Sequence, residues 1–177
     1  MTPNMYLRAV PVALALLLSA CGGKSEETAT AYCPAPFTVQ DAGRLTHFRD
    51  GPGRDPRDVE YEAALAGVGT SCTLRRNQMD VTLIMRVAVS AGPSVAAGQT
   101  RVPYFVRVLG SSGQVVQGQD FTADFKLSSA NPRGQSQEEF TLTLPFSQVS
   151  QLGSYRIAVG LKPSMEELDY NRRAGQR

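Results

Sequence analysis

The sequence has no tryptophan, one histidine and three cysteines. The missing tryptophan excludes the buried tryptophan that is typical of antibody domains. Structural zinc takes four protein ligands, so a zinc site would need every one of these cysteines together with the histidine. The formal net charge is only +2. The balance of charge therefore indicates neither a nucleic-acid partner nor a polybasic membrane surface.

The chain also has no apolar run long enough to cross a bilayer as a helix. Residues 9–20 are almost wholly apolar after a short start that carries a single positive charge, at Arg8. Twelve residues rise about 18 Å as a helix, against roughly 30 Å for a bilayer core. This pattern predicts an export signal over residues 1–20, which is removed and takes no part in the fold.

The signal ends in Leu18-Ser19-Ala20-Cys21, which resembles the bacterial lipobox. In lipoproteins with that motif, the residue that matches Cys21 is acylated and becomes the mature N-terminus. Several acyl chains anchor a protein stably where a single one does not. Gly22 follows the cysteine, and no Asp stands there to indicate retention in the inner membrane. The resemblance therefore implies the periplasmic face of the outer membrane; the alternative is a secreted protein with Cys21 as a free thiol.

The small polar residues after Cys21 predict a flexible tether over residues 21–32. Ten such residues reach on the order of 18 Å, so the folded part is expected close to the membrane. Residues 33–171 suffice for one domain with its own core. Residues 172–177, with Arg172, Arg173 and Arg177, are expected to be a solvated basic tail.

Cys33 and Cys72 remain as a pair once Cys21 carries the lipid. In an oxidising compartment the pair predicts a disulfide, and the alternative is two buried free thiols. The bond would tie the N-terminal segment to the end of an early strand.

The rest of the domain alternates apolar and polar side chains with a period of two, which predicts β-strands. The pattern is clearest over residues 79–90, where every second residue from Met79 to Val89 is apolar. Residues 102–109 are apolar on both faces and predict a central strand, followed by a turn at Ser111-Ser112-Gly113. The other alternating segments are 59–65, 119–127, 139–146 and 154–161. Such strands predict an all-β fold, a single antiparallel sandwich of the immunoglobulin or fibronectin kind, with a closed barrel as the alternative.

Two segments do not follow this alternation. Residues 38–58 are polar, rich in arginine and interrupted by glycine and proline, which predicts an irregular loop. Ser164 and Glu167 have the spacing of a capping box, which predicts a short helix over residues 165–171. We expect Met165 and Leu168 to pack that helix on the sandwich.

The stretches LTHFRDGPGRDPRDVEYEA, PYFV and VGLKPSMEELDYNRR, with a cysteine after the first, resemble a family of uncharacterised lipoproteins from alphaproteobacteria. The resemblance runs from about Cys33 to Arg173. It implies an exported, lipid-anchored β-domain in which the arginine-glycine loop recurs. It assigns no activity, cofactor or catalytic residue.

Catalytic patterns are not evident, and the sequence does not predict an enzyme. His47 is the only histidine and is expected to be a surface or packing residue of the loop. No serine lies in a G-x-S-x-G elbow. The adjacent carboxylates Glu138–Glu139 and Glu166–Glu167 are expected at exposed ends of elements, and Glu60 and Glu62 on a solvated strand face.

The acidic residues Asp50, Asp55 and Asp58 are oxygen ligands of the kind that Ca²⁺ prefers, but their spacing matches no EF-hand. Arg–Asp pairs that hold the loop on the sandwich are the preferred interpretation, and no cofactor or metal is predicted.

The sequence favours a binding or scaffolding module for another envelope protein. The candidate interaction loop contains Arg49, Arg54, Asp55, Arg57 and Asp58. The alternative for this loop is a purely structural one, in which Leu45 and Phe48 anchor it on the domain. The alternative is a small-ligand carrier or an envelope hydrolase with a pocket near residues 38–58. That alternative requires a hollow lined by His47, Arg54 or Asp58.

Overall fold

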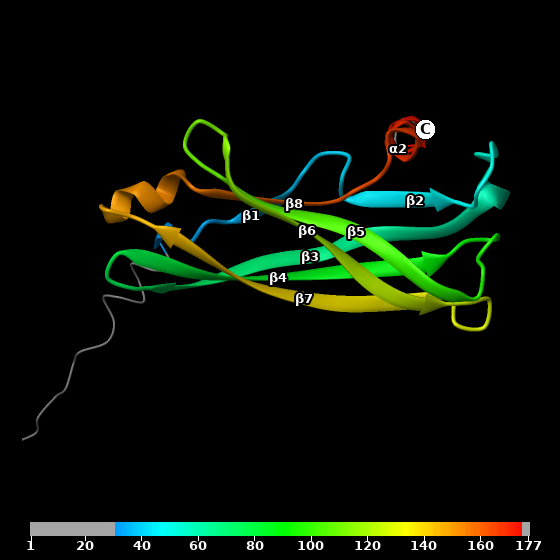
Figure 1. The fold of residues 1–177 in the computed structure, drawn as a ribbon, viewed down its shortest axis with the longest axis horizontal. Coiled ribbons are helices and arrows are strands. Elements are labelled where there is room, and N and C mark those ends of the chain that lie inside the picture. The colour runs from blue at the N-terminus through cyan, green and yellow to red at the C-terminus, as the bar shows by residue number, and fades with distance from the viewer. Residues whose placement is uncertain (1–30, 175–177) are drawn as a thin grey trace, which may run out of the picture.

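The computed structural model describes residues 31–174, which form eight strands, two 3-10 helices and an α-helix (Figure 1). Their bounds are β1 Pro36–Thr38, β2 Arg44–Phe48, η1 Pro56–Asp58, β3 Val59–Leu74, β4 Gln78–Ala91, β5 Gly98–Leu109, β6 Val115–Leu127, β7 Arg133–Pro145, η2 Val149–Ser154, β8 Arg156–Leu161 and α2 Met165–Ala174. The predicted signal, Cys21 and most of the predicted tether lie outside the described residues, as does Arg177. Within the described part, no helix is long and apolar enough to span a membrane.

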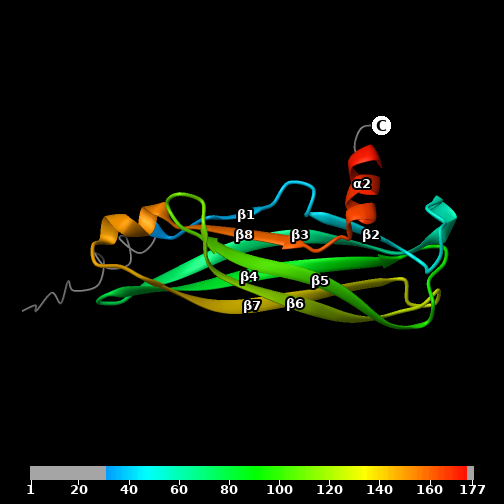
Figure 2. The ribbon, with the colours of Figure 1, turned by 45° about the horizontal axis from the view of Figure 1, so that its top comes forward.

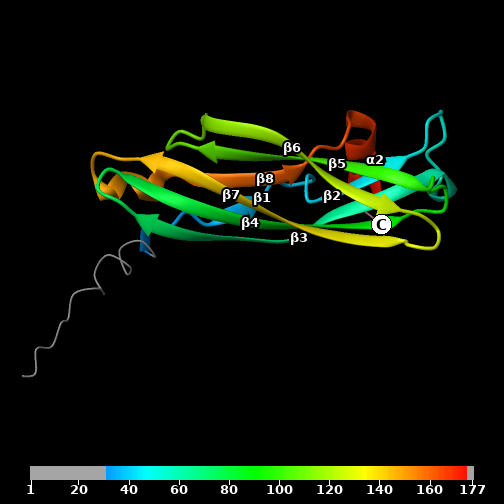
Figure 3. The same ribbon diagram turned by 60° about the horizontal axis from the view of Figure 1, so that its bottom comes forward.

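The strands form two four-stranded sheets packed face to face. Sheet A has the order β1-β8-β5-β6 and sheet B the order β2-β3-β4-β7. Figure 3 shows β3, β4 and β7 side by side in front of the strands of sheet A. Each sheet keeps two edge strands, so the predicted sandwich is confirmed and the closed alternative is wrong. One departure from the antiparallel expectation is the short pair β1–β8, which is parallel.

The core lies between the two sheets and follows the alternation in the sequence. In β4, Met79, Val81, Leu83, Met85, Val87 and Val89 all face inward and are at most 4% exposed. Each such side chain contributes about 1.5–3 kcal/mol when it leaves water. Strand β5 is central as predicted, between β8 and β6. The turn after it is also confirmed, with Gly113 at a φ of 79°, which glycine adopts without steric cost.

Several strands are longer than the sequence predicted, and β2 was not predicted at all. β3 continues beyond Leu65 through a register shift between Leu65 and Gly67, which interrupts the alternation. β7 begins at Arg133, so Glu138 and Glu139 lie inside a strand and not at its end. The short strand β2 lies inside the segment predicted to be irregular. Its sequence, RLTHF, is too short and polar for periodicity to identify.

Helix α2 confirms the predicted capping box. The backbone N–H of Ser164 donates to Glu167 Oε2 at 2.6 Å, and the N–H of Glu167 donates to Ser164 Oγ at 3.3 Å. The expectation that Met165 packs on the sandwich is wrong, since it is 73% exposed, whereas Glu167 is buried. The helix continues to Ala174, so Arg172 and Arg173 belong to the helix and not to a tail.

The predicted disulfide joins Cys33 to Cys72, with 5.6 Å between the Cα atoms. Beside it, Thr70 Oγ1 donates to the carbonyl of Pro34 at 2.9 Å. We call this the disulfide end of the sandwich. The opposite end carries residues 49–58 and α2, and we call it the helix end (Figure 2). From Asp58 to Cys72 the chain rises about 3.3 Å per residue along β3, so the two ends lie roughly 45 Å apart.

We predict that loss of the disulfide lowers the free energy of unfolding by about 2–4 kcal/mol, because the bond closes a loop with a sequence separation of 39 residues. Urea denaturation with and without a reductant measures this. The double variant Cys33→Ala/Cys72→Ala should have the reduced protein's midpoint and no response to reductant. Equal midpoints in all samples would contradict the prediction.

Candidate functional site

Residues 38–58 form the platform that holds helix α2. Five residues of this segment contact the helix: Asp41, Arg44, His47, Phe48 and Arg54. The two segments are far apart in the sequence, and no pattern within either one predicted their contact. The first turn of α2 is acidic, and residues 38–58 contain arginine and histidine. This complementarity of charge is the signal from which the contact could have been inferred.

The most buried of these contacts joins Glu167 to His47. Glu167 Oε1 lies 2.7 Å from His47 Nδ1, and Glu167 is only 8% exposed. The second ring nitrogen faces Glu60, with 3.8 Å between Nε2 and Oε2. The imidazole also stacks on Tyr61, with 4.7 Å between the ring centroids. His47 is a packing residue, one of the two roles expected for it, but it lies on strand β2 and not in a loop. The expectation of an exposed Glu167 is wrong, because the fold brings together residues 120 positions apart.

The pKa values of the pair shift in the directions that favour an ion pair. The hydrogen bond to Glu167 raises the pKa of His47 above its usual 6.5, although partial burial opposes this. Burial by itself would raise the pKa of Glu167. Hydrogen bonds from His47 and Ser164 outweigh it and hold that pKa below its usual 4.5. Both charges are therefore present together at mildly acidic pH.

Five further contacts surround this pair. Arg54 forms an ion pair with Glu166 and lies over the ring of Phe48, at 5.3 Å from its centroid. Phe48 meets Tyr170 edge to face at 4.9 Å. Two other contacts hold the last turns of the helix: Asn171 Nδ2 donates to the carbonyl of Arg44 at 3.0 Å, and Arg172 Nε lies 3.1 Å from Asp41 Oδ2.

The other residues of the candidate loop pair with one another. Arg49 Nε and Nη2 donate to Asp58 Oδ1 at 2.9 and 2.6 Å, beside a backbone bond from Arg49 N to the carbonyl of Asp58 at 3.0 Å. The second oxygen of Asp58 accepts the N–H of Asp55 at 3.2 Å. Asp55 accepts from Arg57, whose side chain is 88% exposed. The Arg–Asp pairs that the sequence favoured are thus present, and they close the connection between β2 and β3.

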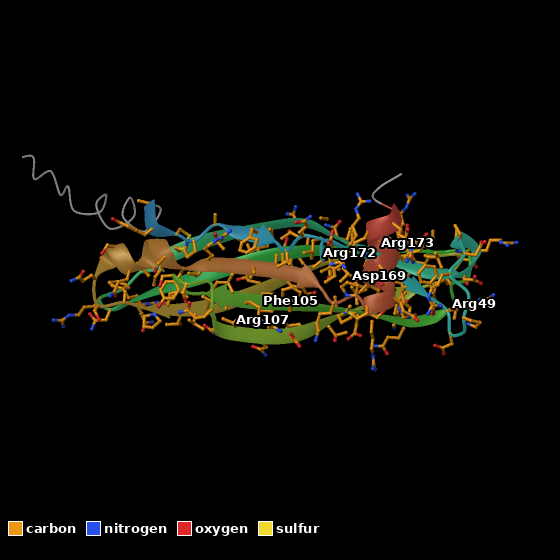
Figure 4. All side chains as sticks on the ribbon, turned by 90° about the horizontal axis from the view of Figure 1, so that it is seen from above. Arg49, Phe105, Arg107, Asp169, Arg172 and Arg173 are labelled. Carbon is orange, nitrogen blue, oxygen red and sulfur yellow. A yellow bond between two sulfur atoms is a disulfide. The ribbon has the colours of Figure 1, made fainter. Side chains whose placement is uncertain are left out.

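The loop residues do not converge on a common ligand. Arg54 and Phe48 face α2, Arg49 and Asp58 face each other, and Arg57 lies toward solvent. In Figure 4, Arg49 lies at the same end of the molecule as Arg172 and Arg173 on α2, while Phe105 and Arg107 lie toward the middle of sheet A. Among residues 31–174, no three His, Cys, Asp or Glu side chains are placed to hold a metal ion.

Helix α2 separates two hollows at the helix end. One, of about 570 Å³, is lined by His47, Glu60, Thr100, Arg101, Lys162 and Glu167. The other is a groove of about 920 Å³ on the outer face of sheet B, with Tyr170 and Asn171 of α2 along one side. Both hollows are open to solvent, and both depend on the docked helix for one side.

The chemistry available at His47 is limited by its partners. Both of its ring nitrogens face carboxylates, and no described hydroxyl or thiol forms a hydrogen bond with them. Nucleophilic catalysis needs a nucleophile within reach of the base. As arranged, the pair serves to hold α2 against β2.

No protein-family model, curated protein or solved structure matches the chain significantly.

We predict that the helix end is stabilised most between about pH 4.5 and 6.5, from the pKa directions of His47 and Glu167. The raised pKa of His47 gives stability that is complete below 6.5 and declines as the pH rises through the raised value. The lowered pKa of Glu167 gives stability that is complete above 4.5 and declines as the pH falls through the lowered value.

The measurement is the difference in Tm between wild type and His47→Gln across this pH range. It should be greatest inside the window and shrink on either side. Glu139→Gln, on the outer face of β7, is the control and should give a difference without this maximum. A difference for His47→Gln that does not change with pH would contradict the prediction.

We predict a large difference between two neighbouring loop variants. Asp58→Ala leaves the Arg49 guanidinium and the Asp55 N–H without their acceptor, and Asp58 is 8% exposed. It should lower the free energy of unfolding by about 1–3 kcal/mol. Arg57→Ala removes a solvated side chain and should leave the free energy of unfolding close to the wild-type value. Urea denaturation of both variants measures the two free energies of unfolding. Equal losses in Asp58→Ala and Arg57→Ala would contradict the prediction.

Proposed function

We propose that the protein is a lipid-anchored module of the cell envelope that binds or scaffolds another envelope protein through its helix end. The lipobox-like sequence before Cys21 supports the anchor, and the resemblance to alphaproteobacterial lipoproteins agrees with it. The disulfide between Cys33 and Cys72 is consistent with an oxidising compartment such as the periplasm.

The observation that carries the proposal is the position of the two ends. The first described residues lie beside the disulfide, whereas residues 49–58 and α2 lie at the opposite end (Figure 1). A tether of about ten residues reaches on the order of 18 Å, much less than the roughly 45 Å along β3. A chain anchored at Cys21 therefore keeps the disulfide end near the membrane and can present the helix end away from it.

The helix end has the features of a protein-binding surface. It carries irregular segments, exposed charges such as Arg57 and Arg173, and an open groove beside α2. Loops positioned by a rigid scaffold are common sites of recognition. The internal pairing of Arg49, Arg54 and Asp58 keeps the surface in one conformation, which lowers the entropic cost of binding.

The test is photo-crosslinking of the lipidated protein in intact envelopes, with products identified by mass spectrometry. Photo-reactive amino acids replace Arg57 and Arg173 at the helix end and Arg76 at the disulfide end. We expect one discrete protein from the two helix-end positions and not from position 76, where lipid adducts should dominate. Scattered products, or lipid adducts alone from every position, would overturn the proposal.

The same experiment includes Cys21→Ala as a control for the anchor. This variant should leave the membrane fraction and lose the helix-end product if anchoring places the surface. Continued membrane association of Cys21→Ala would contradict the lipid anchor.

A second candidate is a small-ligand carrier or hydrolase, which the hollow of about 570 Å³ beside His47 favours. Its polar groups include Arg101 and Lys162 as well as the paired Glu167. It ranks second because the ring nitrogens of His47 face carboxylates. Saturable binding of a small anion that His47→Gln abolishes without unfolding the domain would favour this candidate.

A further inference from the structure

The groove beside α2 is built on two rows of paired residues that cross all four strands of sheet B. The first row runs Arg44, Ala64, Ala88 and Gln135, and the second runs Thr46, Glu62, Ser90 and Arg133. Each row has an arginine at one end. The centre of the first row is Ala64 and Ala88, and the centre of the second is Glu62 and Ser90. The groove is hollow because Ala64, Ala88 and Ser90 leave its floor low between α2 and β7.

The two arginines of the groove have no partner of their own within residues 31–174. Neither guanidinium donates a hydrogen bond or forms an ion pair there, and both line the groove. Most other arginines at the helix end are paired: Arg49 with Asp58, Arg54 with Glu166 and Arg172 with Asp41. Glu62 also lines the groove, near its centre, and pairs with neither arginine.

The spacing of these charges specifies a ligand. Adjacent strands lie about 4.8 Å apart, so Arg44 on β2 and Arg133 on β7 are separated by roughly 15 Å, with Glu62 between them. A peptide extended across the strands rises about 3.3 Å per residue, so carboxylates four positions apart span a similar distance. An ammonium group midway between them would face Glu62.

We propose that this groove binds an extended peptide segment that carries two carboxylates about four residues apart with a cationic side chain between them. The proposal rests on the proposed function, since it names the chemistry of the partner that the helix end binds. The guanidinium groups bind the two carboxylates, and the low floor of Ala64, Ala88 and Ser90 accommodates the backbone of the segment. A carboxylate-rich glycan is the competing occupant and is included in the test.

The probe is the blocked, fluorescently labelled peptide Glu-Ala-Lys-Ala-Glu, titrated with the full chain in detergent and measured by anisotropy at low salt. We expect saturable binding that weakens as salt is added. Gln-Ala-Lys-Ala-Gln, which differs only in the two carboxylates, should bind much more weakly. Arg44→Gln and Arg133→Gln should each weaken binding of the acidic peptide by about five-fold or more.

Two further variants separate the groove from general charge and from misfolding. Arg76→Gln removes the same charge at the disulfide end and should leave binding unchanged. Ala88→Phe fills the floor with a residue that suits a strand, so it should abolish binding while Tm stays near the wild-type value. Equal losses for Arg76→Gln and Arg44→Gln, or no saturable binding, would overturn the proposal.

A polyuronate that binds in place of the peptide, with the same dependence on Arg44 and Arg133, would assign the groove to a glycan and also overturn the proposal. Failure here is distinguishable from failure of the proposed function. A discrete crosslinked protein without peptide binding would leave the module standing and remove the groove from it. Peptide binding without any crosslinked partner would support the groove as a peptide site and count against the proposed envelope module.

Discussion

The helix end depends on one contact, that between Glu167 and His47. A carboxylate that is 8% exposed needs partners, and it finds them in the imidazole and in the N–H of Ser164. Because Glu167 is fixed there, α2 stands against β2, an edge strand of only five residues. The helix in turn forms one side of the groove on sheet B and one side of the hollow at His47. An edge strand that would otherwise expose unpaired backbone groups is thereby covered.

The sandwich has two chemically different ends. At the disulfide end a covalent bond and the hydrogen bond from Thr70 fix the first described residues to β3. At the helix end ion pairs and aromatic contacts serve the same purpose, as in Arg54 with Glu166 and Phe48 with Tyr170. Between them lies an apolar core whose inward residues on β4 are almost fully buried. A rigid body of this length separates whatever is attached at one end from whatever is bound at the other.

Prediction from the sequence succeeded where a pattern is local and repeated. Every second residue from Met79 to Val89 is apolar. Six apolar residues in strict alternation predict a β-strand with one buried face. The capping box of Ser164 and Glu167 likewise depends on residues three positions apart. Prediction failed at β2, where five mixed residues give no periodic signal, and at Met165, because the helix turns a carboxylate toward the sandwich in its place.

The sequence by itself determined the alternation that makes the chain a sandwich, the pairing of Cys33 with Cys72 and the start of α2. The alternation and the start of α2 follow from residue type and short spacing, which act before any tertiary contact forms. The cysteine pairing follows from the count, since Cys33 and Cys72 are the only cysteines besides Cys21. Only the tertiary structure decided that the arginine-rich segment holds α2, that Glu167 is buried against His47, and that Arg44 and Arg133 border one groove. The contacts with α2 join residues 112 to 131 positions apart, and the groove lies across four strands. Local spacing does not indicate which strands become neighbours. Packing the two inward faces together fixes the neighbours, and with them every site on the surface.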